Sequence, residues 1–184
     1  MKKYYLLKIT CWAFLIMSTF SCSSDLNFDQ VNDLKLQPVV EGNLSYFNVA
    51  ATDFLADNGS EYNLVLDSQD FDIFRDRYLN DYLQKADLHF EITNTINRAF
   101  KADILLLNDN DQVLYTISFD IPASAGTPTV ISKMEIFENA KLQLLKNTRK
   151  LQFALTVKSG PAFNSNSTGN LILRSSATVY LEIE

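Results

Sequence analysis

The chain has 184 residues, of which 47% are apolar, and its 22 acidic and 16 basic side chains give a formal net charge of −6. This acidic balance argues against a surface for nucleic acid or anionic lipid, since both need clustered lysine and arginine. A chain of this length and composition can bury one core of its own.

The first 21 residues have the pattern of an export signal. Three lysines near the start precede an apolar stretch from Ile9 to Met17, and small polar residues lead to Cys22. With a cysteine at the expected cleavage position, the segment resembles the signal of bacterial lipoproteins. That resemblance implies that a peptidase cuts before Cys22 and that Cys22 is acylated. We therefore expect acyl chains on Cys22 to anchor the protein in a bacterial outer membrane, facing the periplasm or the cell surface.

The match to the lipoprotein signal is partial. Thr19 and Phe20 depart from its usual pattern, whereas Ser21 is the small residue required beside the cut. Lipoproteins of Bacteroidetes are looser at these positions, and the Asn-, Asp- and Lys-rich style of this chain is similar to theirs. The alternatives are an ordinary signal peptide cut nearby, a buried core helix, and an uncleaved anchor. For the last of these, the apolar stretch is shorter than the roughly 20 residues that span a bilayer.

Cleavage before Cys22 would leave a more acidic chain. The signal holds three of the 16 basic residues and none of the 22 acidic ones, so the remainder has 13 basic and 22 acidic residues and a formal charge of −9. Cys11 lies inside the signal, and Cys22 would carry the lipid, which leaves no thiol for a disulfide. The stability of the domain must then come from a packed core.

Residues 22–38 are predicted to form an acidic tether, and residues 39–184 a single domain. Asp25, Asp29 and Asp33 alternate with apolar residues in the tether. Acidic residues after a lipidated cysteine partly resemble the signals that send some Bacteroidetes lipoproteins to the outer leaflet. The alternative is a polar linker whose few apolar residues dock on the domain.

Seven segments of the domain are predicted strands, because apolar and polar residues alternate in them with period two. An antiparallel sheet with one wet face produces this pattern. The segments cover residues 40–49, 62–66, 88–92, 100–106, 113–121, 151–157 and 177–183.

Residues 71–83 favour a helix, with Asp67 or Ser68 where the N-cap belongs. Its aromatic stripe forms either part of the core or a ligand surface. The stripe comprises Phe71, Phe74, Tyr78 and Tyr82.

A second helix is expected after a capping-box pattern, in which Ser132 and Glu135 would exchange bonds with each other's backbone amides. An apolar face follows from Ile136 and ends near Asn147. Residues 141–144 are also compatible with extended structure.

These elements predict a mainly β fold, an antiparallel, immunoglobulin-like β-sandwich with two short helices. In "ITNTINRAFKADILLLNDNDQVLYTISF", a strand, a corner containing Asn94 and Asn97, a strand, a polar turn and a further strand follow one another. This order resembles the opening of the immunoglobulin-like domain of late-embryogenesis water-stress proteins, and is similar to that of some Bacteroidetes lipoproteins. The resemblance implies a binding or structural role, with no catalytic residue to carry over.

The sequence offers little chemistry for catalysis. His89, between Asp87 and Glu91, is the single histidine. Zinc sites gather three or four ligands, mostly His and Cys, so we expect His89 to be a solvated residue. No P-loop, G-x-S-x-G or G-x-G-x-x-G motif occurs. We expect no catalytic residue, no metal and no cofactor, with a hydrolase that uses two distant carboxylates as a third hypothesis.

Two predicted loops contain residues that could bind a ligand or a partner. Asn108–Asp111 is rich in oxygen ligands, but it lacks the glycine and glutamate of an EF-hand, so a hairpin turn is expected. In residues 160–169, Phe163 is either an exposed contact residue or part of a flexible connection.

We therefore expect a non-enzymatic accessory lipoprotein that binds another envelope protein, and no nucleic acid. The alternative is a lipoprotein that binds a glycan or an apolar small molecule. The glycan version is weakened because the one tryptophan, Trp12, lies in the signal. An apolar cavity beneath residues 71–83 would favour carriage of a small molecule, and a solid core there would favour the accessory role.

Overall fold

The computed structural model describes Tyr4 and residues 35–62, 64–71 and 76–183, and of these Lys35–Ile183 belong to one compact unit. Cys22, the signal apart from Tyr4, and the tether as far as Leu34 lie outside the described residues. No helix among the residues described is both long and apolar enough to cross a bilayer.

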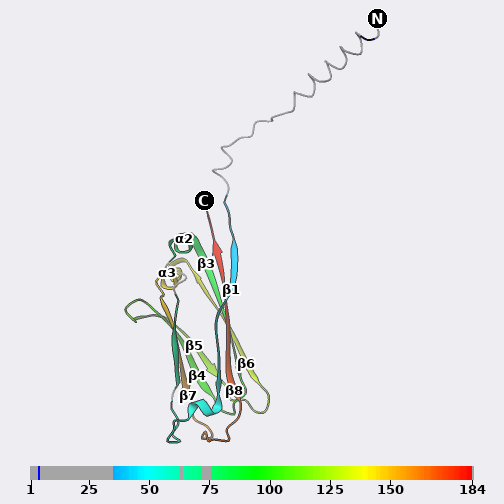
Figure 1. Cartoon of the computed structure of the whole chain (residues 1–184), viewed down its shortest axis with the longest axis vertical. Helices are drawn as coiled ribbons and strands as arrows, with labels where there is room; N and C mark the ends of the chain where they lie inside the picture. Colours follow the sequence, from blue (N-terminus) through cyan, green and yellow to red (C-terminus); the bar gives the residue numbers. More distant parts are fainter. Residues whose placement is uncertain (1–3, 5–34, 63, 72–75, 184) are drawn as a thin grey trace. The chain divides into compact units, whose positions relative to one another are not determined.

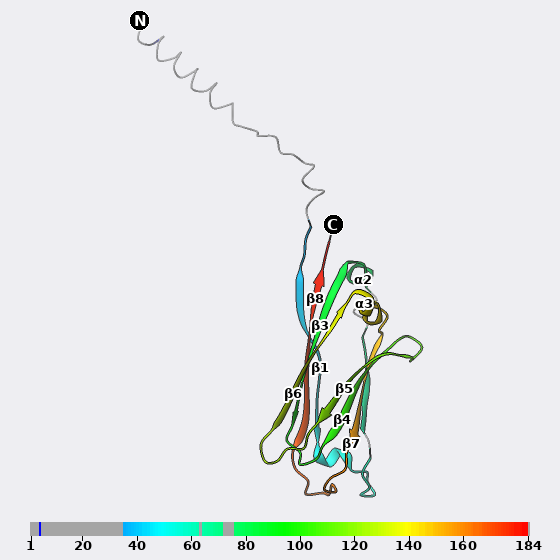
Figure 2. The ribbon, with the colours of Figure 1, turned by 180° about the vertical axis from the view of Figure 1, so that it is seen from behind.

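The unit is built from two antiparallel sheets of four strands, packed face to face (Figure 1). The first has the order β1-β8-β3-β6 and the second β2-β7-β4-β5, and Figure 2 shows the two layers from behind. The strands are β1 (Val39–Ala50), β2 (Leu64–Asp70), β3 (Leu83–Asn94), β4 (Phe100–Leu107), β5 (Val113–Ile121), β6 (Thr129–Glu138), β7 (Lys150–Val157) and β8 (Asn170–Leu181).

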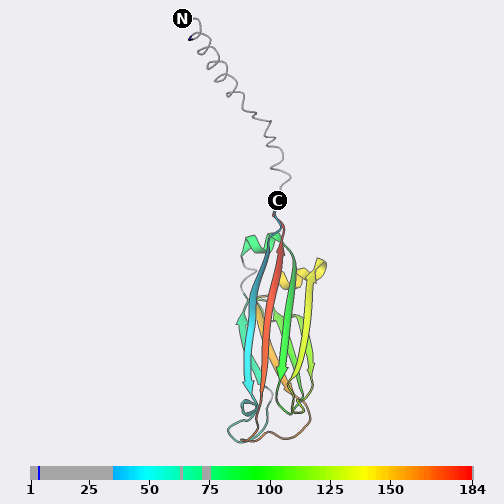
Figure 3. The ribbon, with the colours of Figure 1, turned by 90° about the vertical axis from the view of Figure 1, so that its right-hand side faces the viewer.

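The predicted antiparallel β-sandwich is confirmed, and its strand order is that of a jelly roll. Successive strands alternate between the two sheets, except for the β4–β5 hairpin. In an immunoglobulin domain, by contrast, the first two strands share one sheet. The order therefore differs from the immunoglobulin one expected from the 88–121 segment. Figure 3 shows the first sheet face on, with β1, β8, β3 and β6 side by side.

Period-two alternation explains the core. Every second residue of β3 from Ala86 to Asn94 is buried, and the same holds along most of β4. Inward side chains of the two sheets meet between the layers, as in the edge-on contact of Phe90 with Phe119 at 6.0 Å between ring centroids. Further fully buried side chains include Phe54, Phe100, Phe137, Ile104, Ile117 and Leu145.

All seven predicted strands are present, but the second predicted helix begins too early. Ser132–Glu135, expected as a capping box, lies within β6, which pairs with β3 along its whole length. Phe137 faces the core, whereas Met134 and Ile136 are exposed, so the inward face has period two. The helix α3 (Asn139–Lys146) follows, and its C-cap Asn147 confirms the predicted end.

The first predicted helix is also shorter than expected. Asp67 and Ser68 belong to β2 and are not the N-cap. Helix α2 spans Arg77–Tyr82, and its N-cap is Asp76, whose carboxylate accepts a bond from the Leu79 amide at 3.2 Å. Phe74 lies outside the described residues. A 3₁₀ turn, η2 (Ala51–Phe54), follows β1 at the opposite end of the sandwich from α2 and α3 (Figure 1).

Lys35 and Leu36, which fall within the predicted tether, are held by the C-terminal segment. Leu36 and Ile183 exchange backbone bonds of 3.0 and 2.9 Å, and Lys35 pairs with Glu182 at 3.0 Å. The first sheet is thus extended beyond Val39.

Candidate functional site

The β5–β6 side of the sandwich is closed by polar side chains that join the two sheets. Tyr115 of β5 donates to Glu135 of β6 at 2.7 Å, and Lys141 of α3 also bonds to Glu135. The Tyr115 ring meets Phe137 edge-on at 5.6 Å. Burial tends to raise the pKa of Glu135, but the bonds from Lys141 and Tyr115 outweigh it, so that this pKa lies below its ordinary value.

The β1–β2 side is open, and an apolar cavity of about 270 Å³ lies there between the sheets. β1 and β2 are the edge strands of their sheets on this side. Two of its polar lining residues, Gln69 and Asp70, are exposed to solvent. The remaining lining residues are Val40, Gly42, Asn43, Leu44, Phe71, Leu88, Leu151, Ala177 and Val179.

A second, more polar hollow of about 500 Å³ adjoins this cavity and shares Asn43, Leu44 and Gln69 with it. Both edge strands are irregular here, because the register of β1 shifts between Asn43 and Tyr46 and that of β2 between Leu66 and Gln69. Bulges of this kind bend an edge strand and re-aim its side chains. We refer to the cavity and the hollow together as the β1–β2 cleft.

Ser175 stabilises the irregularity in β1. Its hydroxyl accepts from the Ser45 amide and donates to the Ser45 carbonyl oxygen, both at 2.9 Å. A side chain therefore replaces the regular ladder at this point, and the regular pairing of β1 with β8 toward the helical end stops at Asn43.

Gly42 contributes much of the open space. A Cβ built on Gly42 would meet no heavy atom within 4 Å, and the backbone there does not require glycine. Glycine inside a strand weakens the strand and often marks a close approach of a ligand or another backbone. The cavity is thus present partly because one inward position of β1 carries no side chain.

The aromatic stripe of residues 71–83 is only partly associated with the cleft. Phe71 lines the cavity, directly after β2, and its amide donates to the Arg149 carbonyl oxygen at 2.7 Å. Tyr78 is 51% exposed and contacts Tyr82 on α2, away from the cavity lining. The cavity therefore lies beside Phe71 and not beneath α2.

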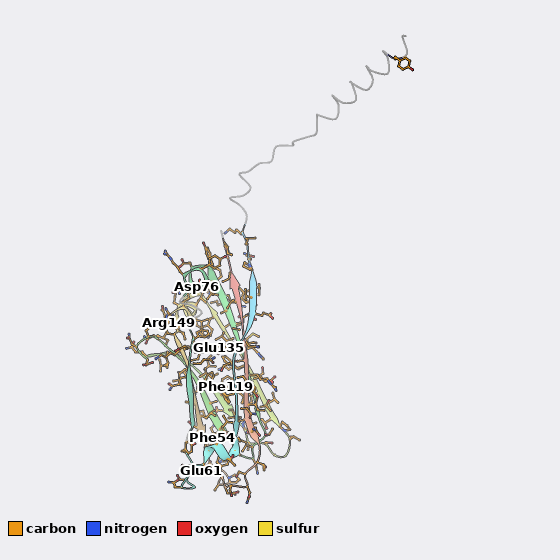
Figure 4. The ribbon with its side chains drawn as sticks, viewed as in Figure 1. Phe54, Glu61, Asp76, Phe119, Glu135 and Arg149 are labelled. Carbon is orange, nitrogen blue, oxygen red and sulfur yellow. The ribbon has the colours of Figure 1, made fainter. Side chains whose placement is uncertain are left out.

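Phe163 is buried, so the hypothesis of an exposed contact residue is wrong. Its ring stacks on Phe54 at 5.6 Å, and the Arg98 guanidinium lies 5.2 Å above it. Glu61 accepts from the Phe163 amide at 2.6 Å and from Arg98 at 3.0 Å. This cluster packs the 160–169 loop at the end of the sandwich away from the helices, where Figure 4 shows Phe54 and Glu61.

His89 lies on the outer face of the first sheet, with Nε2 2.9 Å from the Ser132 hydroxyl oxygen. The neighbouring carboxylates are engaged elsewhere, since Asp87 bonds to Lys85 at 2.9 Å and Glu91 lies 3.6 Å from Arg174. Within the described part of the chain, no three His, Cys, Asp or Glu side chains are grouped to hold a metal ion.

Residues 108–111 form the predicted turn between β4 and β5. The Asn108 carboxamide oxygen accepts from the amides of Asn110 and Gln112, and Asp111 adopts a positive φ of 57°. Lys150 bonds to Asp111 at 2.6 Å. The oxygen atoms of this loop therefore serve its own backbone and a neighbouring cation.

The β1–β2 cleft could not be predicted from the sequence, although the inward position of several lining residues could. Leu88, Leu151 and Val179 follow from the alternation as inward-facing. What alternation cannot show is that the two edge strands leave a space between them. The one available signal was Gly42 inside a predicted strand.

No known protein family matches the chain, and no curated protein sequence matches it either. Similar solved structures include the VP2 subviral particle of infectious bursal disease virus, at 11% identity and TM-score 0.46, over 79% of this chain and 32% of that one. A protein from Parabacteroides distasonis has 12% identity and TM-score 0.42, over 64% of this chain and 38% of that one. Desmodium yellow mottle tymovirus has 15% identity and TM-score 0.32, over 81% and 90%.

The chain thus spans about a third of the length of the first two of these structures. At such low identity and overlap the similarities concern the fold alone. The assignment of the jelly roll rests on the strand order of this chain.

Proposed function

We propose that the protein is a lipoprotein anchored through Cys22 in a bacterial outer membrane, and that its jelly-roll domain is a non-catalytic module that binds another envelope protein. The binding role rests on one observation, the apolar cavity at the open β1–β2 side. The opposite side of the sandwich is closed by Tyr115, Glu135 and Lys141. A ligand that covered the cleft would bury apolar surface that now faces solvent, which favours association.

Binding of an apolar small molecule is the second candidate, and the lining of the cavity favours it. Val40, Leu44, Phe71 and Leu151 would contact such a molecule, and the volume of about 270 Å³ lies near the lower limit of ordinary ligand pockets, about 300 Å³. Native mass spectrometry of the purified protein tests this candidate. A small molecule that co-purifies with the wild type but not with Gly42→Val would support it.

The anchor is tested by replacing Cys22 with alanine. We expect Cys22→Ala to stay unprocessed or to leave the membrane fraction, because the acyl chains have no other attachment point. If Cys22→Ala is still processed and still sediments with membranes, the lipoprotein assignment is wrong.

The binding role is tested by pull-down from solubilised membranes with three forms of the full chain. Gly42→Val fills the cavity from β1, whereas Thr178→Val adds the same residue to β8 on the opposite face of the sheet. We expect a partner that wild type and Thr178→Val retain and that Gly42→Val loses. If all three forms recover the partner equally, the cleft is not the binding site.

A further inference from the structure

We propose that the partner contributes an extended segment that pairs with the free edge of β1 and places alternate apolar side chains in the cavity. This inference rests on the proposed binding function and names the chemistry of the partner. The segment would become a fifth strand of the first sheet, next to Val39–Asn43.

Within the described part of the chain, β1 is an edge strand and no strand pairs with its outer side. Leu36 and Ile183 exchange backbone bonds, and the Leu181 amide donates to the Pro38 carbonyl oxygen at 3.0 Å. Because bonded and non-bonded positions alternate in an antiparallel pair, Val40 and Gly42 also bond to β8. The amides and carbonyl groups of Val39, Glu41 and Asn43 therefore point away from β8, toward the free edge.

The cavity lies next to this free edge of β1, because every second residue of the strand faces inward. Val40, Gly42 and Leu44 face inward and line the cavity. In a strand added beside β1, every second side chain would likewise point inward, at the level of this lining. Gly42 leaves room there, since nothing lies within 4 Å of a Cβ built on it. The cavity thus has the position expected for side chains of an absent edge strand.

The bulge fixes the length of the paired segment. Regular pairing of β1 with β8 begins at Val39, the first residue of the strand, and stops at Asn43. The regular free edge is therefore Val39–Asn43, which matches about five residues of a partner, or about 17 Å at 3.4 Å per residue.

Charge favours a basic partner segment. Among the described residues, Asp70 of β2 is the one charged residue of the cavity lining, and Glu41 is exposed on the free edge of β1. Arg174 of the adjoining hollow lies 3.6 Å from Glu91. Lys150, which pairs with Asp70 in the strand register, has its ammonium group 2.6 Å from Asp111. A segment with apolar residues at inward positions and lysine or arginine at outward ones complements the cavity and the outward carboxylate of Glu41.

The test uses the full chain in phosphatidylcholine nanodiscs, which carry no net charge to attract a basic peptide. The probe is a synthetic peptide of about seven residues in which valine alternates with lysine. Three control peptides differ in one property each. The first has the same composition in two blocks, the second has glutamate for lysine, and the third is N-methylated on the amides that would pair with β1. Titration calorimetry measures affinity, and hydrogen-exchange mass spectrometry follows residues 39–43.

We expect the alternating peptide to bind and to slow exchange in Val39–Asn43, because its backbone would engage the amides that face the free edge. Each control peptide should bind at least about tenfold more weakly, since each removes one required contact. Gly42→Val should weaken binding to a similar degree by filling the cavity, whereas Thr178→Val should bind like the wild type.

Two results would overturn the inference while leaving the proposed function intact. One is equal binding of the N-methylated peptide, which would show that no backbone pairing occurs. The other is failure of every peptide, combined with a membrane partner that wild type retains and Gly42→Val loses. If Gly42→Val instead retains every partner of the wild type, the binding function assigned to the cleft fails as well.

Discussion

At the scale of single residues, Arg98 joins three parts of the chain that are distant in sequence. Its side chain is only 8% exposed, and its Nε donates to the Lys158 carbonyl oxygen at 2.6 Å. The guanidinium also donates to the Pro161 carbonyl oxygen and to Glu61. These bonds satisfy a buried cation and fix the loop that carries Phe163.

Glu61 makes the stability of this cluster depend on pH. The bond from the Phe163 amide lowers the pKa of Glu61, partial burial opposes this, and the Arg98 guanidinium lowers it again, so that the pKa lies below its ordinary value. A pKa that is lower in the folded than in the unfolded chain stabilises the fold above the unfolded-state value, and this stabilisation is lost as pH falls through the folded-state value.

We therefore predict that Glu61→Gln lowers the free energy of unfolding by about 1 kcal/mol at neutral pH, a small value because 29% of the Glu61 side chain is exposed. The difference from the wild type should shrink as pH falls below the ordinary value of 4.5 and through the lower folded-state pKa, where the carboxylate of the folded protein becomes protonated. Urea unfolding at several pH values measures it. A difference that stays constant into acid would contradict the assigned pKa shift.

Two glycines should respond to alanine in opposite ways. Gly169 has a φ of +103°, and a Cβ there would lie 2.6 Å from the Thr95 carbonyl oxygen, so we predict that Gly169→Ala destabilises by about 1–3 kcal/mol. Gly42→Ala meets open space and should be neutral or stabilise by about 0.5 kcal/mol through the unfolded chain. Thermal unfolding compares the stability of the two variants. Equal losses of stability would contradict the open space found at Gly42.

At the scale of elements, the strands could be predicted because alternation and turn chemistry agree in them. β5 is an example, since Ile117, Phe119 and Ile121 face the core and the 108–111 turn precedes it. β6 could not be predicted in the same way. Its residues Ser132–Glu135 match a local helix signal. They form a strand because β6 pairs with β3, which is distant in sequence.

β6 does not look amphipathic in sequence because Lys133 and Glu135 occupy inward positions, whereas its exposed face carries Val130, Met134 and Ile136. A carboxylate occupies a place where an apolar residue is expected, and Tyr115 and Lys141 from other elements satisfy it. The β1–β2 cleft could not be predicted for a similar reason, because contacts between distant segments create it. The open side follows from the order of strands and from Gly42, and neither is visible in local periodicity.

We predict that Tyr115→Phe destabilises the protein by about 1 kcal/mol, because Glu135 loses one hydrogen bond but keeps Lys141. The pKa of Glu135 should rise toward its ordinary value, since the Tyr115 bond helps to lower it. Denaturant unfolding measures the first effect and carboxylate NMR titration the second. Tyr78→Phe, at a position that is 51% exposed, serves as the control and should change neither.

At the scale of the whole molecule, strand order creates two sides with different properties. The polar bonds between β5 and β6 close one side without any need for a ligand. The edges of β1 and β2 on the other side combine an apolar cavity with backbone groups that point away from the sheet. Exposed strand edges are normally protected against pairing with other chains. An edge left open beside a cavity is therefore the natural place for a partner strand.

The charge of the molecule leads to a last prediction about the anchor. Without the first 21 residues the chain carries a formal charge of −9, so it lacks the basic excess that would hold it on anionic headgroups. Attachment would then depend on acyl chains, at about 0.8 kcal/mol per buried methylene group. Raising salt from about 0.1 M to 1 M shortens the Debye length from about 10 Å to 3 Å and weakens electrostatic attachment. We predict that such a wash leaves the wild-type protein in the membrane pellet and that detergent releases it, as followed by immunoblotting. Release by salt alone would show that the protein surface, and not lipid on Cys22, makes the attachment.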